Sequence, residues 1–127
     1  MSKKILIVDD EIYIRVLLEQ TLEDFEDAGV ELLSAGNGME ALEIAQVERP
    51  DLIIMDVMMP GLSGHETCQR IRNDPDLAKT HIIMLTAKGQ EIDRLHSIEA
   101  GANEYITKPF DPDQLVKRAA DVLGVRV

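Results

Sequence analysis

The chain of 127 residues contains one cysteine, no tryptophan, two tyrosines and two phenylalanines. Cys68 has no second cysteine with which to form an internal disulfide, which agrees with a reducing compartment. Because aromatic rings are so few, the core must be built mainly from aliphatic side chains. The length is right for one domain, and no linker rich in Gly, Pro or Ser divides it, so we predict a single domain over residues 1–127.

Basic residues are scarce as well. Thirteen Lys and Arg against 24 Asp and Glu give a formal net charge of -11. This charge repels phosphate backbones and anionic lipid surfaces, so we expect no direct nucleic acid binding and no membrane binding. The N-terminal apolar run ILIV is too short for a signal peptide or a membrane span. We therefore expect a cytoplasmic protein that binds cationic groups or metal ions.

Short apolar runs alternate with stretches of helical periodicity along the whole chain. Several of the runs are almost continuous in Ile, Leu, Val and Met, which is typical of strands buried on both faces of a parallel sheet. We predict strands at 3–8, 30–35, 51–55, 81–85 and 103–107.

Helix signals lie between and after these strands. The first helix is predicted from an apolar stripe at Ile14, Leu18, Leu22 and Phe25. A further helix runs from about Gln90 to Ala100, where Gly101 can end it. Three more helices are predicted from N-terminal signals, which are Asn37 with Glu40, Ser63 with Glu66, and Asp111 with Pro112. Five strands alternating with five helices indicate an α/β fold with a five-stranded parallel sheet.

Polar residues stand where the predicted strands end. Asp9 and Asp10 follow the first strand, Asp56 follows the third, Thr86 the fourth and Lys108 the fifth. Ligands of such sheets bind outside the carboxyl ends of the strands. We therefore expect these five side chains to meet at one edge of the sheet.

The chemistry of this set is specific. Three neighbouring aspartates repel one another, and a divalent cation relieves that repulsion. Hard oxygen ligands that leave room for water suit Mg²⁺. Lys108 adds a positive charge and Thr86 a hydroxyl donor, so an anion can approach a carboxylate here. Phosphoryl transfer needs this arrangement, and a carboxylate can itself be the acceptor.

Four motifs at these positions, IVDDE, IIMDVMMPG, MLTAK and YITKPF, together resemble the receiver domain of two-component response regulators, including the single-domain chemotaxis type. The resemblance extends from Lys4 to about Leu123. It implies a flavodoxin-like, doubly wound sheet in the order 2-1-3-4-5.

The resemblance also implies roles for individual residues. Asp56 matches the phosphoacceptor, with Lys108 pairing with the phosphoryl group and Thr86 donating a hydrogen bond to it. Mg²⁺ would be held by Asp10 and Asp56, by Asp9 through water, and by the backbone carbonyl of Met58.

Two further positions match the switch apparatus of the family. Tyr105 matches an aromatic residue whose rotamer follows Thr86, and the bond between Lys108 and Pro109 is expected to be cis.

The function implied is signalling. A sensor histidine kinase or a phosphotransfer protein would donate the phosphoryl group from a phosphohistidine. The chain would not be an enzyme beyond its own phosphorylation and dephosphorylation. The phosphorylated state would change the surface of the fourth helix, fifth strand and fifth helix for a downstream protein target or a fused effector domain.

Arg118 and Glu104 suggest a charged pairing surface, but the oligomeric state stays open between monomer and phosphorylation-dependent dimer.

The resemblance implies that Met58 and Lys88, two positions after Asp56 and Thr86, tune the lifetime of the phosphorylated state. An apolar Met58 cannot orient a water by hydrogen bonding, so we predict slow self-dephosphorylation.

Three alternative functions fit the sequence less well. A phosphatase of the haloacid dehalogenase type needs a second Asp two residues after the nucleophile, where this chain has Met58. A flavin-binding module would offer amide and hydroxyl groups in the first loop, where this chain has acids. A receiver that is not phosphorylated would lack acceptor or metal positions that are present here. Cys68 is predicted to be a core residue, and His65, His81 and His96 are predicted to be structural or surface residues, none of them a phosphohistidine.

Overall fold

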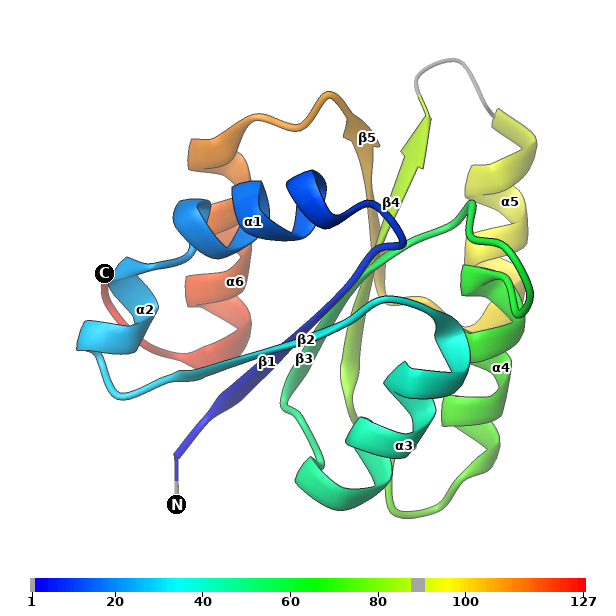
Figure 1. Cartoon of the computed structure of the whole chain (residues 1–127), viewed down its shortest axis with the longest axis horizontal. Helices are drawn as coiled ribbons and strands as arrows, with labels where there is room; N and C mark the ends of the chain where they lie inside the picture. The colour runs from blue at the N-terminus through cyan, green and yellow to red at the C-terminus, as the bar shows by residue number, and fades with distance from the viewer. Residues whose placement is uncertain (1, 88–90) are drawn as a thin grey trace.

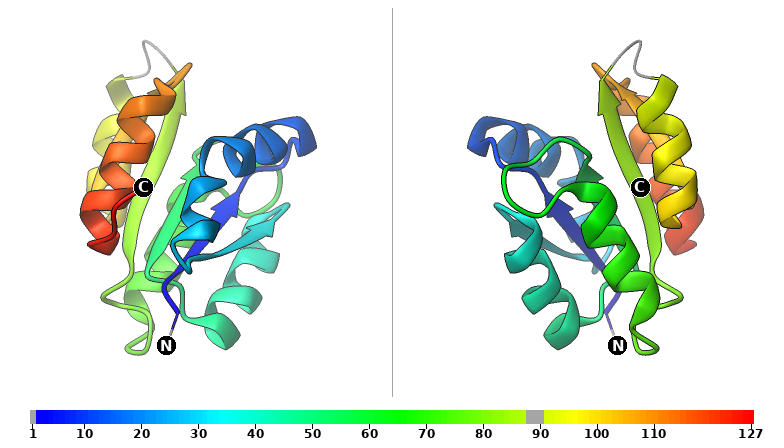
Figure 2. Two further views of the ribbon diagram at one scale, coloured as in Figure 1. Left: turned by 90° about the vertical axis from the view of Figure 1, so that its left-hand side faces the viewer. Right: turned by 90° about the vertical axis from the view of Figure 1, so that its right-hand side faces the viewer.

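The computed structural model describes residues 2–87 and 91–127. Its centre is a five-stranded parallel sheet in the order β2-β1-β3-β4-β5, which confirms the predicted order (Figure 1). All five strands end at the same edge, opposite the N-terminus (Figure 2). The strands lie within two residues of their predicted positions and are β1 (Lys4–Val8), β2 (Glu31–Ala35), β3 (Leu52–Asp56), β4 (His81–Ala87) and β5 (Glu104–Lys108).

Helices cover both faces of the sheet. The helices are α1 (Ile12–Thr21), α2 (Asp24–Asp27), α3 (Gly38–Glu48), α4 (Gly64–Asn73), α5 (Glu91–Ala100) and α6 (Pro112–Leu123). α1, α2 and α6 lie on one side, and α3, α4 and α5 on the other (Figure 1). Lys88 and Gln90, which the sequence analysis named, lie outside the described residues. No helix among residues 2–87 and 91–127 combines the length and apolar character needed to span a bilayer.

The predicted first helix is in fact two helices, so the prediction of five helices was wrong by one. The amide of Leu22 still donates to the carbonyl of Leu18, but the amide of Phe25 donates to Leu22, a step of three residues instead of four. This tightening begins α2 and keeps Phe25 fully buried. The apolar stripe therefore continues through the break, which is why periodicity did not reveal it.

The three predicted N-terminal signals and the helix end predicted at Gly101 are confirmed. The amide of Glu40 donates to Asn37 Oδ1 at 2.8 Å, and the amide of Glu66 donates to Ser63 Oγ at 3.1 Å. Asp111 accepts in the same way at the start of α6. Gly101, with φ of 99°, follows α5 in the left-handed conformation.

The sheet separates two aliphatic cores. Side chains alternate along β1, β3 and β4, so Leu6, Ile53 and Met84 pack under α3, α4 and α5. Ile7 and Ile54 pack instead under α1, α2 and α6. Cys68 is fully buried in the first core, as predicted, and burial raises the pKa of its thiol to about 11. Two packed cores fix the sheet rigidly and hold its carboxyl edge in place.

Candidate active site

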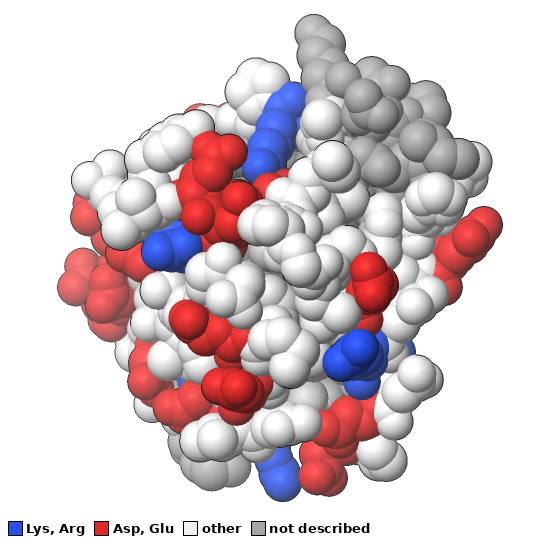
Figure 3. All heavy atoms as spheres, turned by 45° about the vertical axis from the view of Figure 1, so that its right-hand side comes forward, with Lys and Arg blue, Asp and Glu red and all other residues white. Residues whose placement is uncertain are grey.

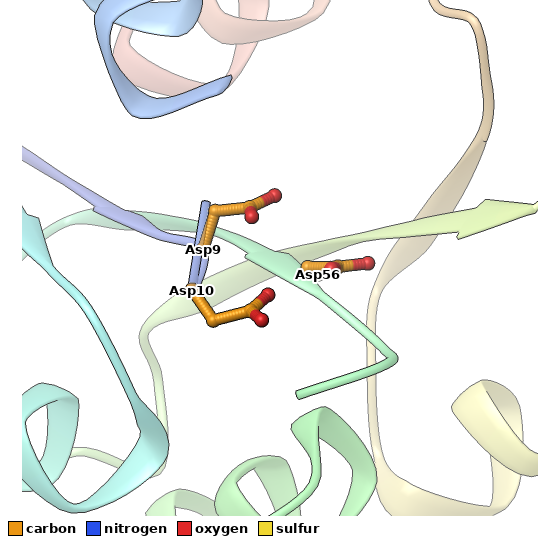
Figure 4. A group of neighbouring side chains, drawn as sticks. All are labelled: Asp9, Asp10 and Asp56. Carbon is orange, nitrogen blue, oxygen red and sulfur yellow. The ribbon is translucent and has the colours of Figure 1, made fainter. Parts of the chain in front are cut away.

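Three carboxylates meet at the carboxyl edge of the sheet. Asp9 and Asp10 follow β1, and Asp56 is the last residue of β3, the neighbouring strand. One carboxylate oxygen from each lies within 4.8 Å of the other two. Figure 4 shows the three side chains directed into a common space. Asp9 is fully buried and Asp56 is 7% exposed, while Asp10 is exposed to solvent.

Lys108 brings a positive charge to the buried pair of carboxylates. It is the last residue of β5, and its Nζ lies 3.1 Å from Asp56 Oδ1 and 3.5 Å from Asp9 Oδ2. A single ammonium cannot neutralise three carboxylates, so the cluster keeps excess negative charge. Acidic side chains also gather elsewhere on the face shown in Figure 3, with basic ones scattered between them.

Burial is the largest influence on the pKa of the two inner aspartates. It raises the pKa of both Asp9 and Asp56, and the nearby Lys108 only partly offsets this. Burial also lowers the pKa of Lys108, yet its two carboxylate partners outweigh burial and raise that pKa overall. An ion pair alone would lower the pKa of its acid. The acids behave differently because they are more deeply buried than the lysine that pairs with them.

Backbone groups fix the orientation of these side chains. The amide of Asp9 donates to the carbonyl of Ala35, and Asp9 Oδ1 accepts from the amide of Glu11 at 2.9 Å. Asp56 Oδ1 accepts from the amide of Met58 at 3.4 Å. Such hydrogen bonds to backbone amides favour the charged form of a carboxylate.

Gly64 allows α4 to begin directly against the end of β3. A Cβ at this position would lie 2.3 Å from the backbone oxygen of Asp56, which real Cβ atoms do not approach. The loop that carries Met58 therefore folds tightly beside the carboxylates, and the Met58 side chain is 69% exposed at its surface.

Thr86 and Tyr105 occupy the adjoining strands. Thr86 lies in β4, next to Leu85, which pairs with Asp56, and it is buried. Tyr105 pairs with Met84 across β4 and β5 and packs, partly buried, against the core under α3, α4 and α5. The Lys108–Pro109 bond is cis, as the resemblance implied.

Arg15 was not among the predicted site residues. This residue lies in α1, and its Nη1 donates to the backbone carbonyl of Asp9 at 2.6 Å. The signal that could have revealed it is its place one turn after Glu11, from which a long side chain can fold back over the first loop.

The three histidines contact other side chains. His65 Nε2 lies 3.0 Å from Ser97 Oγ, and its ring meets that of His96 edge to face. His81 contacts the carboxylate of Glu104. All three histidines therefore have structural contacts away from the carboxylate cluster.

The donor set of the cluster fits Mg²⁺. Carboxylate oxygens are hard ligands, they lie close enough to share one ion, and their charge exceeds what Lys108 supplies. The exposed carboxylate of Asp10 leaves the cluster open toward solvent, where bound water can complete the coordination.

An apolar hollow adjoins the site on the side of α1. It measures about 400 Å³ and is lined almost wholly by apolar atoms of Ile14, Leu17, Ala87, Lys108, Pro109, Phe110 and Pro112. The helix α1 has further exposed apolar side chains, namely Ile12, Tyr13 and Val16. A surface of this kind beside a reactive centre is suited to contact with another protein.

Residues 5–120 match the family model of the response regulator receiver domain. With the fold and the carboxylate cluster, this match shows that the chain belongs to the receiver domain family of two-component response regulators.

Curated relatives are regulators. The chain is 44% identical over 123 residues to the alkaline phosphatase synthesis transcriptional regulatory protein PhoP of Bacillus subtilis, covering 97% of this chain and 49% of that protein. It is 46% identical over 123 residues to the phosphate regulon transcriptional regulatory protein PhoB of Pseudomonas aeruginosa, covering 97% of this chain and 52% of that protein. The chain thus spans about half the length of the curated relatives it matches.

Solved structures agree with the fold. A response regulator from Chloroflexus aurantiacus superimposes with a TM-score of 0.88 and 39% identity, covering 98% of this chain and 99% of that one. The receiver domain of the sensor histidine kinase PA1611 from Pseudomonas aeruginosa has a TM-score of 0.86 and 29% identity, covering 98% and 99%. That structure holds a magnesium ion in its active site cleft.

Proposed function

We propose that residues 1–127 form one receiver domain and that Asp56 accepts a phosphoryl group from a phosphohistidine of a sensor histidine kinase or phosphotransfer protein. The observation that carries this proposal is the juxtaposition of a nearly buried Asp56 with Lys108 at 3.1 Å and with two further carboxylates. Membership in the receiver domain family supports it.

In the proposed step, an oxygen of the Asp56 carboxylate forms a bond to phosphorus as the phosphorus–nitrogen bond of the donor breaks. The bonding electrons stay with the imidazole nitrogen. Lys108 pairs with the transferred phosphoryl oxygens, which carry the charge that develops. The hydroxyl of Thr86 donates a hydrogen bond to one of them. The amide of Met58, 3.4 Å from Asp56 Oδ1, helps to hold the acceptor in place.

Mg²⁺ would be held by Asp10 and Asp56, by Asp9 through water, and by the backbone carbonyl of Met58. When bound, the ion supplies positive charge that neutralises the phosphoryl oxygens and the repulsion among the aspartates.

The signal is a shift between two states of the domain. Once Asp56 is phosphorylated, Thr86 moves toward the new oxygens and Tyr105 turns inward. Both side chains belong to the neighbouring strands β4 and β5, and Tyr105 packs under the helices that include α5. The surface of α5, β5 and α6 then presents the phosphorylated form to a downstream protein or effector domain.

The donor would approach over α1. The exposed apolar side chains there and the hollow beside Lys108 lie next to the acceptor, so a helical donor could cover them while its phosphohistidine reaches Asp56. A small phosphoryl donor such as acetyl phosphate does not need the apolar contacts of this hollow.

The test is intact mass after incubation with acetyl phosphate, with and without Mg²⁺, for the wild-type protein and for Asp56→Asn. We expect one added phosphoryl group that requires the metal and is absent in the variant. A wild-type protein without an adduct, or an Asp56→Asn variant that is labelled equally, contradicts the proposal.

A further inference from the structure

Arg15 connects three segments around the loop that carries Asp9 and Asp10. It projects from α1, its Nη1 donates to the carbonyl of Asp9 at 2.6 Å, and its guanidinium lies over Gly36 between β2 and α3. A Cβ on Gly36 would lie 3.2 Å from Nη1 and 3.7 Å from Cζ of Arg15. The glycine therefore leaves the space that the guanidinium occupies.

The two peptide groups that flank Asp10 are both restrained. The carbonyl before it, that of Asp9, accepts the hydrogen bond from Arg15, and the amide after it, that of Glu11, donates to Asp9 Oδ1 at 2.9 Å. Asp10 is exposed to solvent, so packing does little to orient its side chain. The direction of its carboxylate therefore depends on the backbone that Arg15 and Asp9 hold.

We infer that Arg15 is a positioning residue of the metal site, which places the Asp10 carboxylate for Mg²⁺ by fixing the peptide between Asp9 and Asp10. The inference rests on the proposed function and adds a residue to it. Outer partners of this kind typically change metal affinity about 10–100-fold when they are removed. Charge is a competing explanation, because Arg15 is also a cation near three acids.

Four variants separate position from charge. Arg15→Met removes the hydrogen bond and the charge, whereas Gly36→Ala keeps every charge but forces the guanidinium to shift. Gly36 does not require a left-handed backbone, so alanine is tolerated there. The third variant combines both changes. The fourth, Arg126→Met, removes an exposed positive charge near the C-terminus as a matched control.

The first measurement is the dissociation constant for Mg²⁺, by calorimetric titration of the folded proteins. We expect about tenfold weaker binding in Arg15→Met and no change in Arg126→Met. Gly36→Ala is expected to weaken binding by a smaller factor and to add nothing in the Arg15→Met background, because both changes act on one contact.

The second measurement needs no metal. Amide exchange at Glu11 should accelerate in Arg15→Met while exchange at Ile54, in the centre of the sheet, stays the same. A change that merely destabilises the fold accelerates both.

The outcomes are distinct. A wild-type protein that takes up no Mg²⁺ rejects the proposed function and this inference with it. Wild-type binding with an unchanged constant in Arg15→Met rejects the inference alone. Weaker binding in Arg15→Met that Gly36→Ala does not reproduce also rejects it, because lost charge then explains the effect.

Discussion

Lys108 is the residue whose removal tests the electrostatics of the site most directly. We expect Lys108→Met to slow phosphorylation by acetyl phosphate roughly 100-fold, the range for loss of one preorganised charge partner. The cause is that its Nζ, 3.1 Å from Asp56, neutralises charge on the transferred group. Time-resolved intact mass measures the rate, and Lys79→Met, an exposed lysine, is the control. A rate within twofold of wild type, in a protein that still folds, would contradict this role.

We predict that Met58 affects a slower step, the loss of the phosphoryl group. Its backbone amide contacts Asp56, and its exposed thioether side chain cannot orient an attacking water through a strong hydrogen bond. We expect Met58→Asn to accelerate dephosphorylation roughly tenfold, below the ~100-fold typical of a full proton-transfer group. The decay of purified phosphoprotein, followed by mass, checks this. Met39→Asn, an exposed methionine on α3, should decay at the wild-type rate.

Most residues of the candidate site, but not all of them, could be predicted from the sequence. Asp9, Asp10, Asp56 and Lys108 come together as expected because each ends or follows a parallel strand. Arg15 was not predicted, because its partner is a backbone carbonyl, which any residue type supplies, so its place one turn after Glu11 was the only signal in the sequence. Its contact depends on how α1 leaves the sheet, which the residue pattern does not specify.

Among the elements, α1 is where the choice of phosphoryl donor can be tested. Leu17→Asp places a charge beside the apolar hollow without touching the carboxylates. We expect transfer from a histidine phosphotransfer protein to slow about tenfold, the effect of losing roughly 1.4 kcal/mol of apolar contact. Labelling by acetyl phosphate should stay within twofold, because that donor is too small to use the hollow. Equal slowing with both donors would show damage to the site instead.

We expect the contacts that Glu104 makes between β4, β5 and α6 to depend on pH. Arg118 donates to it at 2.6 Å and 2.9 Å, and these hydrogen bonds lower the pKa of Glu104 despite partial burial; the contact with His81 adds to this effect. The folded state therefore binds fewer protons than the unfolded state. The resulting stability is present above the unfolded pKa, near 4.5, and is lost as pH falls through the folded pKa.

The variant Glu104→Gln measures this contribution. Its Tm should lie below that of the wild type at neutral pH, and the gap should narrow as pH falls below about 4.5, the ordinary value of this carboxyl. Glu43→Gln, on an exposed position of α3, should show no such convergence. A gap that is constant between pH 7 and pH 3 would mean that ionisation of Glu104 contributes nothing.

The positions of the helices and strands could be predicted from apolar runs and helix caps, but two features of the helices could not. The step from α1 to α2 conserves the buried stripe, so an apolar period of 3.6 fits both one helix and two. Arg49 ends α3 in the left-handed conformation with φ of 49°, where glycine or asparagine is the usual signal.

On the scale of the whole molecule, strand order creates the site. β1 lies between β2 and β3 in the sheet. From β1 the chain therefore runs first to one side, to form β2, and then crosses to the other side of β1, to form β3. Loops that leave a sheet at such a point diverge and open a crevice. The acids that follow β1 and end β3 meet there, within a chain of net charge -11. Their mutual repulsion opposes folding in the absence of a cation.

Binding of Mg²⁺ should therefore stabilise the entire domain. A ligand that binds only the folded state at 100 times its dissociation constant contributes about 2.7 kcal/mol. For a domain of this size that corresponds to a rise in Tm on the order of 10 °C, reversed by a chelator. Asp10→Asn should abolish most of the rise, and Asp24→Asn, an exposed acid on α2, should keep it. Equal shifts in both variants would mean that Mg²⁺ acts through the general negative charge of the surface, and the three-carboxylate site would then not be where the ion binds.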